Sequence, residues 1–151
     1  MATLLDEAPG RGFEALDEEE CFNLLHEGHF GRVAVSVGAI PAVFPVNYCA
    51  LNGAIYFFTA EGTKLAAATR ETVVAFEIDH CNAVYHEGWS VLAVGVAREV
   101  HEPVMHELVR RLPLDPWAPG SRGHLVRVWP DFVSGRRITC AAVPSTHLTP
   151  T

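Results

Sequence analysis

The chain has 151 residues, of which 49% are hydrophobic and 19% are charged, and this fits one domain with a single core better than a disordered chain or a repeat array. A formal net charge of −7, with only 11 Lys and Arg, argues against a nucleic-acid-binding surface. No apolar run approaches the roughly 18 residues that cross a bilayer, and the acidic N-terminus lacks the basic segment of a signal peptide. We therefore expect a cytoplasmic protein with one domain over 1–151 and flexible tails over 1–15 and 144–151.

The first predicted element is a helix in "LDEEECFNLLHEG". Asp17 and Glu20 have the spacing of a capping box, in which each side chain accepts a hydrogen bond from the other residue's backbone amide. Cys21 and Leu25 belong to the apolar stripe of this helix, and Gly28 is a typical residue at a helix end.

Beyond Phe30 the apolar period falls to two, which predicts strands. The first two are "GRVAVSV" and "AVFPVNYCAL", and Pro45 within the second requires an edge that is unpaired or bulged. Asn52-Gly53 is a strong hairpin signal, and it leads to a third strand, "AIYFFTA".

The rest of the chain continues with further short elements. "TKLAAATR" is a predicted helix, "TVVAFEID" and "GWSVLAVGVAREV" are predicted strands, and "EPVMHELVRRL" is a predicted helix with Pro103 in its first turn. After the loop "PLDPWAPGSRG", we expect "HLVRVWPDF" and "GRRITCAAV" to form a final antiparallel pair. Strands about ten residues apart, without βαβ alternation, favour a small, mainly β barrel over a doubly wound sheet.

A turn of Gly62, Thr63 and Lys64 connects the third strand to the short helix. Backbone amides at a helix start favour an anion, Gly62 lets a ligand approach the backbone, and Lys64 offers a cation, so the turn fits a phosphate. The alternative is an ordinary N-cap at Thr63 with an exposed Lys64. Aromatic residues in the flanking "IYFF" and "FPVNY" favour a flat ligand that ends in a phosphate.

The cysteines give no sign of a metal site or a disulfide framework. Without an export signal, four widely spaced cysteines are expected to be reduced thiols. They are Cys21, Cys49, Cys81 and Cys140. The closest grouping of possible ligands is His80, Cys81 and His86 in a predicted loop, and it lacks the second ligand pair of a zinc site, so we predict no metal.

The run "GRVAVSVGAIPAVFPVNYCALNGAIYFFTAEGTKLAAA", followed by "VVAFEID" and "GWSVLAVGVAREV", resembles the flavin-binding split β-barrel family. Within that family the chain is similar to the pyridoxamine 5'-phosphate oxidase-like group and its small bacterial members related to nitroimidazole reductases. The resemblance extends from about Cys21 to Arg137. It implies a six-stranded antiparallel split β-barrel that forms a homodimer, with flavin mononucleotide (FMN) at the subunit interface.

The resemblance also implies cofactor-binding positions. In such proteins the second strand contacts the flavin ring through backbone groups, the third strand and the following helix hold the phosphate, and the partner subunit and the C-terminal strands add contacts near the ring. The matching residues are Phe44, Pro45, Val46 and Asn47 for the ring, Phe58, Thr59, Thr63 and Lys64 beside Gly62 for the phosphate, and Trp89, Ser90, Trp129 and Arg136 for the remaining contacts.

Three positions depart from the pattern of the vitamin-phosphate oxidases. Their phosphate-binding Arg-Lys pair is replaced by Lys64-Leu65, their substrate-binding Lys by Tyr48, and their C-terminal Arg-x-His by Gly-Arg-Arg at 135–137. Tyr48 is therefore either a residue of a substrate pocket or a packing residue. We expect a flavin-dependent oxidoreductase of an unidentified small molecule rather than a true pyridoxamine phosphate oxidase.

Three alternatives remain open on the same fold. A deazaflavin requires a basic groove, haem requires an iron ligand, and a non-enzymatic binding module requires neither cofactor. The candidate residues are Arg32, Lys64, Arg70 and Arg122 for the deazaflavin, and His80, His86 and His124 for the haem.

Overall fold

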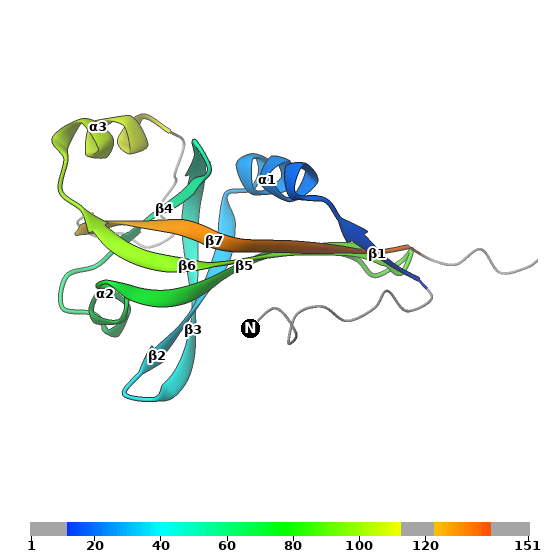
Figure 1. Ribbon diagram of the computed structural model, residues 1–151, viewed down its shortest axis with the longest axis horizontal. Helices are drawn as coiled ribbons and strands as arrows, with labels where there is room; N and C mark the ends of the chain where they lie inside the picture. The colour runs from blue at the N-terminus through cyan, green and yellow to red at the C-terminus, as the bar shows by residue number, and fades with distance from the viewer. Residues whose placement is uncertain (1–11, 113–122, 140–151) are drawn as a thin grey trace, which may run out of the picture.

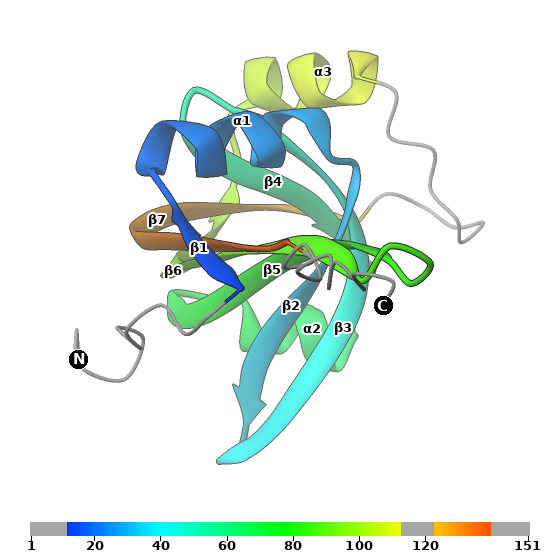
Figure 2. The ribbon, with the colours of Figure 1, turned by 90° about the vertical axis from the view of Figure 1, so that its right-hand side faces the viewer.

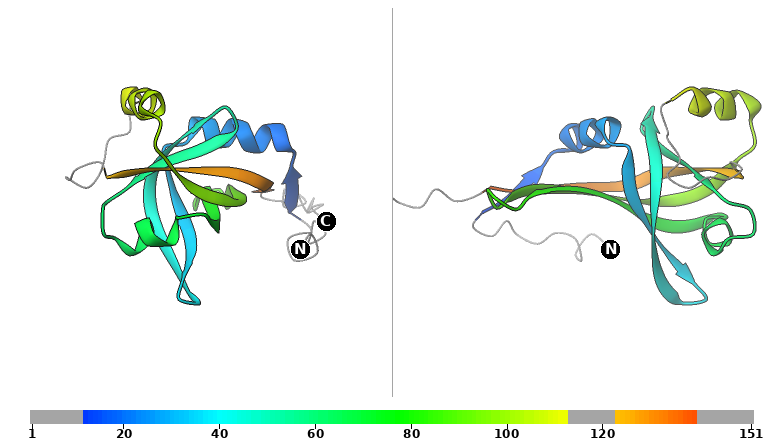
Figure 3. Two further views of the ribbon diagram at one scale, coloured as in Figure 1. Left: turned by 60° about the vertical axis from the view of Figure 1, so that its left-hand side comes forward. Right: turned by 180° about the vertical axis from the view of Figure 1, so that it is seen from behind.

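The computed structural model describes residues 12–112 and 123–139. Their elements are β1 (Phe13–Leu16), α1 (Glu18–Glu27), β2 (Phe30–Val37), β3 (Ile40–Leu51), β4 (Ala54–Thr59), α2 (Lys64–Ala68), β5 (Thr72–Asn82), β6 (Glu87–Val100), α3 (Pro103–Arg111) and β7 (His124–Ile138). Figure 1 shows α1 and α3 on one side of the strands and α2 on the other, and the views in Figure 3 agree. Within the described ranges, no helix is long and apolar enough to span a membrane.

The described strands form one antiparallel sheet in the order β1-β7-β4-β3-β2-β5-β6. A further pairing of β6 with β7 closes six of these strands into a ring, and β1 lies outside the ring beside β7. The prediction of a mainly β, six-stranded antiparallel barrel is therefore confirmed. The seventh strand was not predicted, since Phe13–Leu16 pairs with β7 where we expected a flexible tail as far as residue 15. Figure 2 shows the β2–β3 hairpin extending away from the rest of the barrel.

β7 corrects the prediction of two short C-terminal strands. It is one strand of 15 residues that pairs with β4, then β6 and β1. The ladder passes Pro130 through an irregularity between Val94 and Gly95. Gly95 permits this close approach, because a Cβ at that position would lie 2.0 Å from the Trp129 carbonyl oxygen. Tertiary pairing thus keeps the strand continuous where the sequence suggests a break.

Short-range signals in the sequence are confirmed. The Glu20 amide donates to Asp17 at 2.8 Å, and the Asp17 amide donates to Glu20 at 3.0 Å, which completes the capping box of α1. Asn52 and Gly53 have φ of 52° and 80°, as a tight hairpin turn requires. Pro45 lies on the part of β3 that has no described strand on its β4 side, since β3 pairs with β4 only from Tyr48 onward.

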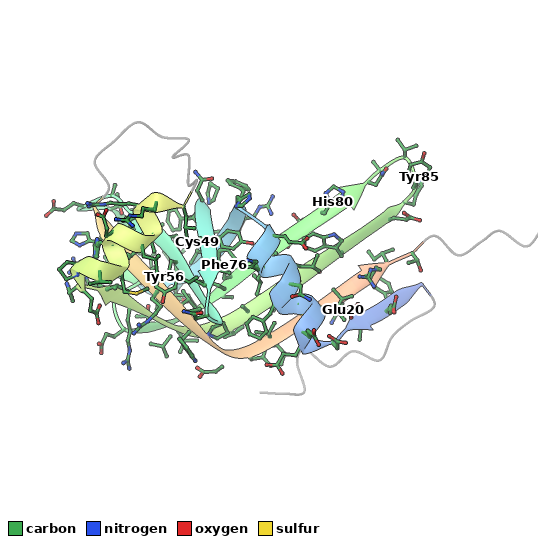
Figure 4. The ribbon with its side chains drawn as sticks, turned by 90° about the horizontal axis from the view of Figure 1, so that it is seen from above. Glu20, Cys49, Tyr56, Phe76, His80 and Tyr85 are labelled. Carbon is green, nitrogen blue, oxygen red and sulfur yellow. The ribbon has the colours of Figure 1, made fainter. Side chains whose placement is uncertain are left out.

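Two buried clusters form the core. The larger fills the barrel and includes Val33, Phe57 and Phe76, while the smaller lies under α3 and includes Tyr56 and Val109. Figure 4 shows Phe76 within the barrel and Tyr56 beneath α3.

Tyr48 fastens α1 to the barrel. Its wholly buried hydroxyl donates to the Leu25 carbonyl oxygen at 2.8 Å, and its ring meets Phe76 edge-on with centroids 4.7 Å apart. Gly28, at the end of α1, leaves room for that hydroxyl, because a Cβ there would lie 2.2 Å from it. The glycine is therefore required by the approach of Tyr48 and not by backbone conformation, since its φ is −76°.

Candidate functional site

The glycine turn, residues 62–64, has the conformation of a capped helix start. The Thr63 hydroxyl donates to the Ala60 carbonyl oxygen at 2.8 Å and accepts from the Ala66 amide at 3.1 Å. Gly62 has φ of +73° with open space where a Cβ would lie. Lys64 is exposed and makes no hydrogen bond or ion pair with the residues that the structure describes. Thr63 thus acts as an N-cap, and the ammonium group of Lys64 remains available to an anion.

Thr59, at the end of β4, carries an orphaned hydroxyl. The residue is only 3% exposed, and its Oγ1 has no hydrogen-bond partner among the described residues. Burying a hydroxyl without a partner costs about 1–3 kcal/mol. The chain supplies this buried polar atom three residues before the glycine turn, which fits a ligand that hydrogen-bonds to the end of β4.

His124 of β7 lies opposite Thr59 in the strand register and makes a close contact with Glu99. This contact lowers the pKa of the Glu99 carboxyl below its usual range. His101 lies 4.0 Å from the other carboxylate oxygen of Glu99. The Glu99 carboxylate therefore has its interaction partners within the chain.

The predicted ring-binding segment, residues 44–47, lies where β3 has β2 on one side and no described strand on the other. Its residues alternate between the two faces of the sheet. Phe44 and Val46 pack against the barrel core, while Pro45 is exposed and Asn47 half-buried on the outer face. Such a segment offers backbone groups along its open edge, as the resemblance requires.

The remaining predicted positions separate into three places. Ser90 and Arg136 are cross-strand partners at the far end of β6 and β7, and Arg136 is 12 residues from His124, or roughly 40 Å along an extended strand. Trp129 lies between these ends on the outer face and is 55% exposed. Trp89 packs against the barrel core, with its ring 6.3 Å from that of His80. One chain therefore does not bring Ser90 and Arg136 to the glycine turn.

Two predicted residues are packing residues in this structure. Phe58 contacts the ring of His106 on α3 and belongs to the cluster under that helix. Tyr48 has no exposed surface, so of its two predicted roles the structure favours packing and not a substrate pocket. Burial also raises the pKa of its hydroxyl, which keeps it protonated.

The histidines considered as haem ligands are dispersed. His80 and His86 lie at the β5–β6 hairpin end, where Figure 4 shows His80, whereas His124 begins β7 at the opposite end of the β6–β7 ladder. The described residues contain no group of three possible metal ligands. Arg32 is paired with Glu77 and Asp79 at 3.3 and 3.2 Å, and Arg122 lies outside the described residues.

The thiols that the structure describes are free, as predicted. Cys21 and Cys49 are buried and Cys81 is exposed, while Cys140 lies outside the described residues. Burial raises the pKa of the Cys49 thiol to about 11, so it stays protonated at neutral pH.

The outer face of the barrel carries a continuous apolar row that the sequence analysis did not identify. Successive cross-strand partners on five neighbouring strands form it, with buried residues alternating on the other face. We call these residues the outer row: Val43, Ala34, Ala75, Val94 and Phe132. The apolar residues on both faces of "GWSVLAVGV" were the available signal, because a strand with one wetted face alternates with polar residues.

Comparison with known proteins agrees with the fold and the resemblance. A family model described as pyridoxamine 5'-phosphate oxidase matches residues 17–137. An uncharacterized protein of Mycobacterium tuberculosis is 34% identical over 128 residues, covering 82% of this chain and 84% of the relative. The chain belongs to the pyridoxamine 5'-phosphate oxidase family.

Two solved structures are similar over most of their length. An FAD binding protein from Mycobacterium smegmatis has 36% sequence identity and a TM-score of 0.72, with 83% of this chain and 98% of that one covered. A FAD-binding protein from Mesorhizobium loti has 25% identity and a TM-score of 0.72, with 84% and 99% covered. Both of these similar structures are of FAD-binding proteins.

Proposed function

We propose that this protein binds a flavin nucleotide at the end of β4 and the glycine turn, and acts as a flavin-dependent oxidoreductase on a small molecule. The observation that carries the proposal is the orphaned Thr59 hydroxyl, buried beside a turn whose Lys64 is unpaired among the described residues. A phosphate or ribityl group would give that hydroxyl a partner, and Lys64 would balance the charge.

The residues present fit the cofactor, and they have no acid–base role of their own. A bound flavin would supply the hydride chemistry. Thr59, the amides of the glycine turn and Lys64 would hold its phosphate end, and the open edge of residues 44–47 would offer backbone groups to its ring.

The form of the flavin is a separate question. The sequence prediction is FMN, whereas the two similar structures are FAD-binding proteins. Both forms share the riboflavin phosphate that the glycine turn would hold, so this site serves either. Titration with FMN and with FAD, compared by dissociation constant, decides between them.

We further propose that two chains associate through the outer row. Val43 is 61% exposed, and the row joins five strands into an apolar strip that one chain leaves partly open to water. Association of two strips removes this surface from water. A second chain would also supply Ser90 and Arg136, which lie too far along the strands to serve the glycine turn of their own chain.

The test begins with an absorbance spectrum of the purified protein, and of the protein after incubation with each cofactor. Flavin absorbs at about 450 nm, deazaflavin at about 420 nm and haem in a sharp Soret band. A protein that stays colourless with all three would contradict the proposal and favour a binding module.

Two variants then test the residues. Lys64→Ala should weaken flavin binding about tenfold or more, from the loss of one charge-assisted contact. Thr59→Val should weaken flavin binding while leaving the flavin-free protein equally or more stable, because it removes an unpaired buried hydroxyl. Arg110→Ala, an exposed residue of α3, is the matched control. Unchanged flavin affinity in both test variants would overturn the assignment of the phosphate to the turn.

A further inference from the structure

Two adjoining hollows lie on the outer surface of β6 and β7, outside the proposed flavin phosphate site. Their volumes are about 270 and 300 Å³, and they share Arg98 and Arg127. The first is lined by Val96, Arg98, Arg127, Trp129 and Asp131. The second continues past the same arginines to Arg70, just beyond α2. Together they form one groove, which begins near α2 and ends at Trp129.

Arg98 and Arg127 are an unusual pair for two neighbouring strands. They are direct cross-strand partners, so their side chains leave the same face of the sheet. Like charges in this position repel and destabilise the pairing. Neither guanidinium makes an ion pair or hydrogen bond with residues 12–112 or 123–139. A ligand carrying two negative charges would remove the repulsion.

Acidic residues of the groove do not neutralise this pair. The carboxylate of Glu99 already contacts His124 and His101. Glu71 and Glu102 line the α2 end, and Asp131 lines the Trp129 end. These carboxylates at both ends favour a ligand whose charge is concentrated at the arginines over an extended polyanion.

Trp129 provides a flat apolar surface beside the arginines. Its side chain is 55% exposed, and its cross-strand partner is Val96. An exposed indole next to guanidinium groups is suited to stacking against a nucleobase. Planar guanidinium groups in turn match the paired oxygens of a diphosphate.

We propose that Arg98, Arg127 and Trp129 form a subsite for a nucleoside diphosphate moiety, with the diphosphate at the arginines and the base on the indole. Such a moiety has two sources. It is part of a separate nucleotide that binds while the flavin site is filled, or it is the adenosine diphosphate portion of FAD, whose riboflavin-side phosphate is the one that the glycine turn would also hold. The subsite does not depend on the proposed flavin phosphate site, because it uses none of the same residues.

The experiment uses ADP, inorganic pyrophosphate, FMN and FAD as probes in calorimetric titrations of the full chain. Wild type should bind ADP, with an affinity that falls as salt is raised. Arg98→Gln with Arg127→Gln should weaken ADP and pyrophosphate at least tenfold, from the loss of charge-assisted contacts. Trp129→Leu should weaken ADP but not pyrophosphate. Arg110→Gln, on α3, should change nothing.

Folding is checked by urea denaturation, in which the single arginine variants should raise the midpoint slightly by removing the repulsion. If the double variant weakens FAD more than FMN, the moiety is the adenosine diphosphate portion of FAD. If ADP still binds when FAD is saturating, the nucleotide is separate.

Failure of ADP to bind wild type, or equal binding by wild type and the double variant, would overturn the subsite. FMN binding would be untouched by that result, whereas loss of FMN binding with retained ADP binding would instead contradict the flavin proposal.

Discussion

β5 and β6 carry apolar side chains on both faces, but only the side chains of the inner face are buried within one chain. On the inner face, Val74, Phe76 and Val91 are at most 2% exposed and pack in the barrel core. On the outer face, Val73 is 62% exposed, and Ala75 and Val94 are half-buried. Both faces belong to the same two strands, so strand propensity and register cannot explain why their side chains differ in exposure.

This difference separates what folding needs from what association needs. The inner face is sufficient to close the barrel, and a soluble single chain would gain from polar residues on the outer face. Apolar residues on the outer row therefore fit the proposed association of two chains, which would cover this surface. Substitutions on each face, and at contacts beside them, test this comparison.

Phe76→Ala tests the inner face and should have the largest effect. The ring is fully buried, so its removal should lower the free energy of unfolding by about 3–5 kcal/mol. Phe132→Ala on the outer row is the matched control and should cost clearly less, because that ring is half-exposed. Urea denaturation at a protein concentration low enough to keep the chains apart measures both. Equal losses would mean that the two faces do not differ in the single chain.

Gly28→Ala tests the contact between α1 and the inner core. Its Cβ would lie 2.2 Å from the Tyr48 hydroxyl, so we expect a loss of about 1–3 kcal/mol in the free energy of unfolding. In a Tyr48→Phe background the clashing oxygen is gone, and the same substitution should cost less. A double-mutant cycle measures this coupling, and strict additivity would count against the contact.

Val94→Lys tests the outer row. It should change the free energy of unfolding of one chain by less than about 0.5 kcal/mol but convert the proposed dimer to a monomer. Val84→Lys, at an exposed position of the β5–β6 hairpin outside the row, should leave association intact. Light scattering after size-exclusion chromatography gives the mass of each. A dimer that survives Val94→Lys at micromolar concentration would exclude the outer row as the interface.

Glu99→Gln should lower the free energy of unfolding by less than about 1 kcal/mol. Since the His124 contact lowers the pKa of Glu99 in the folded chain, its stabilising contribution is present above the ordinary carboxyl pKa and is lost as the pH falls through the folded pKa. The urea midpoints of wild type and variant should therefore differ at pH 7 and converge in acid. A difference between the two urea midpoints that persists at low pH would show that the negative charge of Glu99 is not what stabilises the contact.

The elements set by neighbouring residues could be predicted from the sequence. The capping box at Asp17, the hairpin at Asn52-Gly53 and the unpaired edge at Pro45 each depend on groups a few residues apart. Strand spacing predicted a small barrel, and the resemblance supplied its six-stranded split form and the flavin class. It also directed attention to Thr59, although only the structure reveals the orphaned hydroxyl.

The features that sequence reasoning missed depend on pairing between distant segments. β1 is too short to be recognised without its partner β7, and β7 continues past Pro130 because β6 adapts at Gly95. The opposition of Arg98 and Arg127 follows from that same register. Tyr48 was ambiguous because its orientation is decided by α1, through the hydrogen bond to Leu25.

The pairing of Phe13 with Ile138 also has a consequence for biosynthesis. These partners are 125 residues apart in the sequence, and β7 contributes to three of the strand pairings. Until β7 has emerged from the ribosome, the edges of β4 and β6 that pair with it stay open. Open strand edges of this kind promote aggregation. A domain with so many pairings between distant segments folds slowly, so the nascent chain stays prone to self-association until β7 has paired.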